Sequence, residues 1–185
     1  MPTVRPDFKG YYPRAHWAIE ALLSSPEFST LKWTSLQPNA FLTYYVASAV
    51  EYIKQYKRTG EQGTLRLMAA KDALVGPVDP NEVGIFAAHL LALDDPSSHS
   101  GAKYVLNGPE DITGEQLVGL VEQHIGTKVK DVSYQDLGFL DALLASGFGG
   151  PGQSKTVMAS LNKEVLEIVA PRTTPAEMVN KLLEE

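Results

Sequence analysis

Hydrophobic residues recur at near-helical spacing in the first part of the chain and then give way to a short apolar run. Four of them follow Pro13, which suits a first helical turn: Trp17, Ile19, Leu22 and Leu23. Ser24-Ser25-Pro26 ends this pattern, and residues 31–36 then predict a short, largely buried strand. A helix that leads directly into a buried strand is typical of the crossover units of α/β proteins.

The residues that end this strand are the first candidates for ligand binding. Gln37-Pro38-Asn39 closes the strand, and Phe41 follows two residues later. Ligands of open α/β sheets bind beyond the carboxyl ends of the strands. Pro38, Asn39 and Phe41 are therefore predicted to lie where a ligand binds.

The remaining pattern predicts alternating helices and short strands. Amphipathic or capped segments predict helices over 42–56, 80–93, 113–125, 134–146, 157–169 and from residue 175 on. Strands are predicted over 64–68, 104–106 and 129–132, with another extended piece over 73–78. We expect the 129–132 strand to pair with the strand at Tyr104.

Three of the predicted helices begin with a clear capping signal. Asp79 precedes Pro80, a good first helical residue, so this carboxylate is read as a cap and not as a catalytic base. Thr113 with Gln116 forms a capping box, and Thr174-Pro175-Ala176-Glu177 is a similar signature.

The glycine-rich run 147–152 lacks the order and position of a phosphate-binding loop and is read as a hinge.

Composition narrows the classes of function. The chain has 185 residues with 44% hydrophobic content, enough for one domain with a small appendage. Its net charge is −6 and its basic residues are scattered, which argues against nucleic-acid binding. There is no cysteine, no signal-peptide pattern and no long apolar run. We therefore predict a cytoplasmic protein without disulfides, a metal site or a membrane contact.

Several motifs together resemble one known family. The runs HWAIEALL, WTSLQPNAF, VGPVDPNEVG and YVLNGPEDIT are similar to the second half of NmrA-like proteins, an atypical branch of the short-chain dehydrogenases/reductases. The resemblance covers nearly the whole chain. It implies an α/β fold with the late strands of a partial Rossmann-like parallel sheet and a small C-terminal substrate lobe.

The resemblance also implies a domain division and an incomplete cofactor site. Residues 1–72 would be the remnant of an NAD(P)-binding domain, and 73–185 a largely helical substrate-binding lobe with short strands. The glycine-rich strand–turn–helix that opens the family has no counterpart in this sequence. NADP or NAD would then bind at an incomplete site, and a truncated chain is a further reading.

The family signature places a tyrosine four residues before a lysine on one helix. Tyr12 and His16 have this spacing, with His16 in place of the lysine. The resemblance implies that Tyr12 donates a proton and that His16 orients it or the cofactor ribose. The alternative is an amphipathic helix start with a partly buried aromatic residue.

Three functions stay open at this point. The first is an NmrA-type oxidoreductase that uses a nicotinamide cofactor on a small, largely apolar metabolite, with autonomous activity in question because the phosphate-binding half is absent. The second is a non-catalytic redox-sensing regulator whose exposed sheet edge is covered by a homodimer or a protein partner. The third is a cofactor-free isomerase or cyclase that uses Tyr12, His16 and Asn39.

Overall fold

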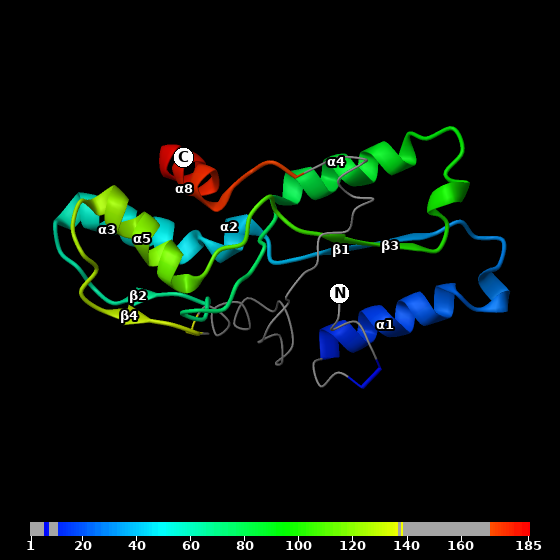
Figure 1. Ribbon diagram of the computed structural model, residues 1–185, viewed down its shortest axis with the longest axis horizontal. Helices are drawn as coiled ribbons and strands as arrows, with labels where there is room; N and C mark the ends of the chain where they lie inside the picture. Colours follow the sequence, from blue (N-terminus) through cyan, green and yellow to red (C-terminus); the bar gives the residue numbers. More distant parts are fainter. Residues whose placement is uncertain (1–5, 8–10, 137, 139–170) are drawn as a thin grey trace.

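The computed structural model describes residues 6–7, 11–136, 138 and 171–185, and it describes side chains in the first helix from residue 14 on. Two lobes lie side by side along the long axis of the molecule (Figure 1). Each lobe has its own two-stranded parallel sheet and its own hydrophobic cluster. The chain is thus an α/β protein with small parallel sheets, as the sequence predicts.

The first lobe is built on a parallel pair of strands, β1 (Thr34–Pro38) and β3 (Ala102–Leu106). Helix α1 (Tyr11–Leu23) lies along one side of this pair and α4 (Pro80–Leu91) along the other (Figure 1). Two short 3₁₀ helices, η1 (Pro26–Phe28) and η2 (Ser97–His99), lie in the connections. The lobe is therefore a sheet between two helices.

Side-chain alternation makes the two faces of the β1–β3 sheet different. On the α4 side, Tyr104 and Leu106 pack with Phe86 and Leu90 in a buried hydrophobic cluster, with Leu36 at its border. Successive strand residues point to opposite faces, so the other face carries the intervening residues of both strands. That face is polar, and a carboxylate from α1 reaches it.

The second lobe is mostly helical. Its helices are α2 (Leu42–Tyr45), α3 (Ala47–Thr59), α5 (Gly114–Ile125) and α8 (Pro175–Glu184). Their apolar faces enclose the larger hydrophobic cluster, which includes Leu42, Ile53, Leu117 and Met178. Strands β2 (Leu65–Arg66) and β4 (Val132–Ser133) form a minimal parallel sheet beside these helices.

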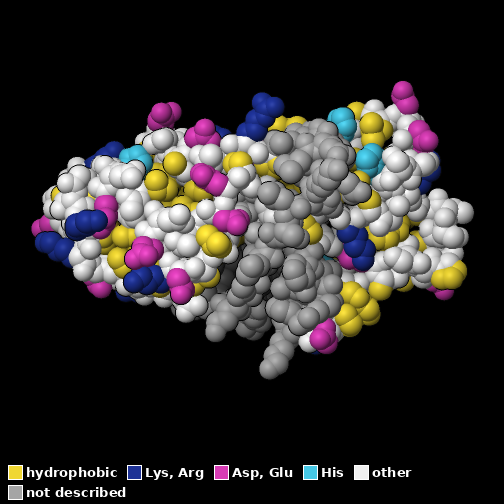
Figure 2. Space-filling view, viewed as in Figure 1, with side chains coloured by type: hydrophobic (Ala, Val, Ile, Leu, Met, Phe, Trp, Pro, Cys, Tyr) yellow, Lys and Arg dark blue, Asp and Glu magenta, His cyan; other side chains and the backbone are white. Residues whose placement is uncertain are grey.

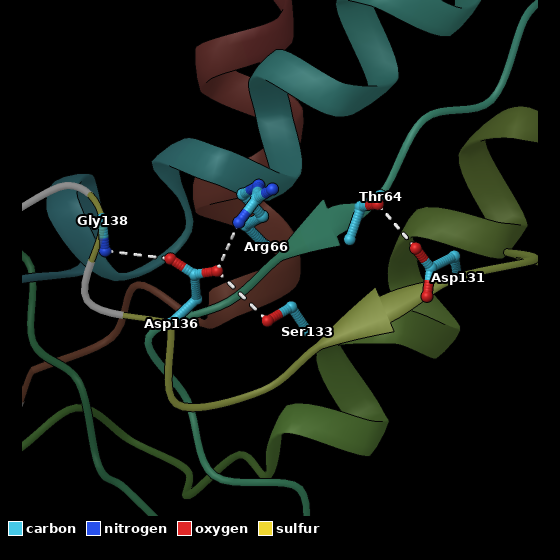
Figure 3. A network of polar contacts seen from close by, with 6 residues as sticks. All are labelled: Thr64, Arg66, Asp131, Ser133, Asp136 and Gly138. Carbon is cyan, nitrogen blue, oxygen red and sulfur yellow. Dashed lines mark hydrogen bonds and ion pairs between the residues drawn. The ribbon is translucent and has the colours of Figure 1, made fainter.

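A polar network holds the small β2–β4 sheet together (Figure 3). The Asp136 carboxylate accepts hydrogen bonds from the Gly138 amide at 2.9 Å, Arg66 Nη1 at 2.9 Å and Ser133 Oγ at 3.1 Å. The backbone hydrogen bond from Gly138 is the largest of the contacts that lower the pKa of Asp136. Because the network joins β2, β4 and the turn after β4, it compensates for the shortness of the strands.

The capping signals are confirmed. Asp79 accepts from the Asn81 amide at 2.8 Å and so caps α4. Thr113 and Thr174 each complete a capping box, with Gln116 and Glu177 respectively. Asp79 is therefore the N-cap of α4, as the sequence predicts.

Strand pairing and strand limits differ from the prediction in part. The strand near residue 132 pairs with β2 and not with the Tyr104 strand, so that prediction is wrong. The 31–36 strand is displaced toward Pro38, and the 42–56 helix is divided at Val46. The helix predicted over 134–146, apart from its first residues, lies outside the described residues, as do the hinge at 147–152 and the helix at 157–169.

The domain boundary at residue 72 stays a prediction, although both hydrophobic clusters include residues from both sides of it.

On the face shown in Figure 2, basic and acidic side chains are interspersed. None of the helices in the described part of the chain is long and apolar enough to cross a membrane.

Candidate functional site

The carboxyl ends of β1 and β3 bring two asparagines together. The Asn39 amide hydrogen-bonds Leu106 O at 2.9 Å, which extends the pairing beyond β1. Asn39 Nδ2 donates to Asn107 Oδ1 at 3.3 Å, and Asn39 Oδ1 accepts from the Ala40 amide at 2.8 Å. We call residues 38–41 and 106–108 the ligand edge, because ligands of open α/β sheets bind at this end.

The segment that leads into α4 closes the ligand edge on one side. The Val78 amide donates to Ala40 O at 2.9 Å, and the Leu42 amide donates to Val78 O at 3.0 Å. Gly108 packs against the same segment so closely that a Cβ there would lie 2.1 Å from Pro77 O. Only glycine fits such a contact, which fixes the backbone beside Asn107.

The predicted binding residues differ in how accessible they are. Pro38 and Phe41 are half-buried, whereas Asn39 is 7% exposed. Tyr44, in α2, is 72% exposed and gives this region an aromatic surface. The structure thus brings Pro38, Asn39 and Phe41 together, while their binding of a cofactor stays a prediction.

A buried carboxylate fastens α1 to the polar face of the β1–β3 sheet. Glu20 accepts hydrogen bonds from Ser35 Oγ at 2.5 Å and Gln37 Nε2 at 2.7 Å, and it pairs with Lys103 Nζ at 2.8 Å. Burial acts to raise the pKa of Glu20, but the hydrogen bonds from Lys103, Ser35 and Gln37 together lower it. Glu20 is therefore ionised at neutral pH.

The predicted catalytic pair lies on this same helix. Tyr12 is in the first turn of α1, but its side chain is outside the described part of the structure. His16 is half-buried and lies four residues before Glu20. The catalytic roles of Tyr12 and His16 stay predictions.

The helix N-termini show how far the described residues fit a dinucleotide. Helices α4, α5 and α8 each have a side-chain cap and an acidic first-turn residue: Glu82, Glu115 and Glu177. A capped and negatively charged N-terminus is a poor site for a pyrophosphate. The N-termini of these three helices therefore do not fit the phosphates of a dinucleotide.

The described residues do not form a metal-binding site. Among them, no three histidine, aspartate or glutamate side chains gather in a way that could hold a metal ion. His89 is exposed, and His99 hydrogen-bonds the buried Tyr104 hydroxyl at 2.6 Å.

Sequence reasoning missed three residues of this region. Asn107 follows a strand, as Asn39 does, so the carboxyl-end rule could have found it. Glu20 lies on the helix face of His16, four residues on, and an acid at that position was a sign of a polar inner face. Its partner Lys103 carried no such signal, because the pairing of β1 with β3 places it.

No family model matches the sequence, and no curated protein matches it. Among solved structures, an NADPH-dependent quinone oxidoreductase from Escherichia coli matches with a TM-score of 0.64 and 24% identity, over 93% of this chain and 62% of that chain. RMD from Pseudomonas aeruginosa, complexed with NADPH, matches with a TM-score of 0.65 and 16% identity, over 94% and 54%.

Triphenylmethane reductase from Citrobacter sp., complexed with NADP(H), matches with a TM-score of 0.61 and 17% identity, over 92% of this chain and 59% of that chain. This chain thus spans less than two thirds of each of these structures. At such identities the likeness establishes the fold alone. The chain therefore has a Rossmann-like α/β fold that corresponds to part of each of these structures.

Proposed function

We propose that the chain is the substrate-holding part of an NmrA-type oxidoreductase that uses NADPH or NADH. The observation that carries this proposal is the Asn39–Asn107 pair, at 3.3 Å, at the carboxyl ends of two adjacent parallel strands. Amide groups fixed at this edge can bind the carboxamide of a nicotinamide or the carbonyl of a substrate.

The substrate that suits this region is a small, largely apolar molecule with a reducible group. Phe41 and Tyr44 supply aromatic surface, while the ligand edge supplies a few oriented amides. A quinone has this combination of a flat apolar ring and carbonyl oxygens. The matched Escherichia coli protein, a quinone oxidoreductase, supports this choice of test substrate.

The protein's own contribution is binding, orientation and proton supply. Asn39 holds the ligand by its amide, and Tyr12 with His16 supplies a proton to the reduced oxygen. The cofactor, when bound, supplies the hydride. Its phosphates need an anchor other than the N-termini of α4, α5 and α8, either from other parts of the chain or from a partner chain.

Turnover tests this proposal directly. NADPH and NADH oxidation would be followed with a panel of quinones, for the wild type, Asn39→Ala and Asn180→Ala. Asn180 is an exposed residue of α8 and is a matched control. We expect quinone-dependent oxidation that Asn39→Ala lowers about tenfold and Asn180→Ala leaves unchanged, which corresponds to about 1.4 kcal/mol. No turnover with any quinone would contradict the proposal.

A second candidate is a non-catalytic interaction protein. Among the described residues the β1–β3 sheet has only two strands, so β1 has one edge without a partner strand. Trp17, Ile19 and Leu22 of the neighbouring α1 are 38–56% exposed, and hydrophobic side chains gather over this helix in Figure 2. Both features favour a homodimer or a protein partner.

Light scattering coupled to size exclusion distinguishes the second candidate. A dimer that Leu22→Lys converts to a monomer would support docking at this face. If the protein is a monomer at all concentrations, the proposed homodimer is excluded.

A further inference from the structure

Helix α1 is attached to its sheet in an unusual way. Among the described residues, no side chain of α1 belongs to either hydrophobic cluster. Glu20, whose side chain is 5% exposed, contacts both strands of the sheet. A helix on a sheet is normally positioned by apolar packing, and in α1 a buried charged contact adds to the attachment.

The partners of Glu20 come from both strands. Ser35 and Gln37 lie two residues apart on β1, and Lys103 lies directly opposite Ser35 on β3. Three donors from two strands converge on one carboxylate, and such charge-assisted contacts are directional. A displacement of α1 by one turn would break all three together.

Helix geometry links this anchor to the ligand edge. Positions 16 and 20 share one helix face, and four residues span about 6 Å of helix. In Figure 1 the helix runs antiparallel to β1, with its N-terminal end beneath the strand's carboxyl end. From Gln37 to Asn39 the strand advances by about 7 Å. Position 16 is thus level with Asn39 when Glu20 is level with Gln37.

We propose that Glu20 is a positioning residue: it fixes α1 along the β1–β3 sheet and so holds His16 beside the ligand edge. The placement of α1 is inferred from the contacts of Glu20 with the two strands. Only the consequence for ligand binding rests on the proposed function.

Two spin labels can measure this placement without any ligand. The chain has no cysteine, so Ala21→Cys on α1 and Gln55→Cys on α3 give two unique, exposed attachment sites. The vector between these helices runs along the long axis of the molecule (Figure 1) and therefore reports movement of α1 along the sheet. Glu20→Ala, Glu20→Gln and the control Glu27→Ala would be compared in this background.

We expect one narrow distance in the wild-type background and in Glu27→Ala. Glu20→Ala should shift or broaden it by about 5 Å, one helical turn, because the anchor is lost. Glu20→Gln keeps an oxygen for Ser35 and Gln37 and should restore the narrow distance. If Glu20→Ala does not fold, the double variant Ser35→Ala with Lys103→Met removes two partners from the sheet side and should give the same shift.

An unchanged distance in folded Glu20→Ala, or in the double variant, would overturn the proposal, even if the melting temperature fell. NADPH titration of the same proteins adds the functional readout, with affinity about tenfold weaker in Glu20→Ala and restored in Glu20→Gln. If the wild type binds no NADPH, the proposed function fails, and the distances still decide the role of Glu20.

Discussion

At the scale of single residues, buried polar side chains in this molecule differ in how their hydrogen-bonding capacity is met. Asn39 and one carboxylate oxygen of Glu20 have hydrogen-bond partners, and the other Glu20 oxygen forms an ion pair with Lys103. Tyr45 and Tyr52, in contrast, bury hydroxyl groups for which the described residues provide no hydrogen-bond partner. A buried polar group without a partner destabilises the folded state, so these residues make opposite predictions.

Replacement of Tyr45 by phenylalanine should not destabilise the protein. The side chain is 4% exposed, and Tyr45→Phe removes only the unpartnered hydroxyl. We expect the free energy of unfolding in urea to stay equal or to rise by up to about 1 kcal/mol. Tyr44→Phe, at a 72% exposed position, is the matched control. A loss of more than about 1 kcal/mol in Tyr45→Phe would reveal a partner for this hydroxyl.

The same residue makes the protein sensitive to high pH. Burial raises the pKa of Tyr45 from 10.0 to about 12. The folded state keeps the phenolic proton after the unfolded state has lost it, so stability falls as the pH rises from 10 toward 12. Tyr45→Phe should lose less stability over this range than the wild type does.

Glu20 makes the opposite prediction at low pH. Its pKa is lowered from 4.5, so its stabilising contribution is present above pH 4.5 and is lost as the pH falls through the folded-state pKa. Glu20→Gln should cost about 1–2 kcal/mol at pH 7, since the half-exposed Lys103 is partly screened by solvent. In urea unfolding the difference should shrink below pH 4.5; a constant difference would contradict this account.

At the scale of elements, the sequence predicts most accurately those features that depend on residues close together in the chain. The caps of α4, α5 and α8 depend on residues within one turn, and all three are found where the sequence placed them. Strand pairing was predicted less well. Strand β4 pairs with β2, and the paired residues are 67 positions apart in the sequence. Such pairing depends on how helices pack the strands together, and no local pattern encodes it.

The capping box of α5 offers a direct check at this scale. Thr113 Oγ1 accepts from the Gln116 amide at 3.1 Å, and the Gln116 side chain accepts from the Thr113 amide at 2.8 Å. Thr113→Ala should lower the free energy of unfolding by about 1 kcal/mol, because the Gln116 amide loses its side-chain acceptor. The exposed Thr127→Ala is the control, and equal effects of the two variants would contradict the capping role.

At the scale of the whole molecule, the candidate site lies where β1 and β3 end and α2 begins. The position of ligands at the carboxyl ends of strands predicts Pro38, Asn39 and Phe41 from the sequence, because this rule depends only on strand direction. It could not place Glu20 or Lys103, whose meeting requires both α1 and β3 to be in position. The structural matches support the same fold but span only part of each matched protein.

The central claim is that residues 38–41 and 106–108 bind a nicotinamide, and NADPH titration followed by nicotinamide fluorescence tests it most directly. We predict a saturable change at about millimolar NADPH, as expected for a cofactor whose phosphates are not bound at the N-termini of α4, α5 and α8, and an affinity about tenfold weaker in Asn39→Ala. No saturable change, or equal binding by Asn39→Ala and the wild type, would contradict the account.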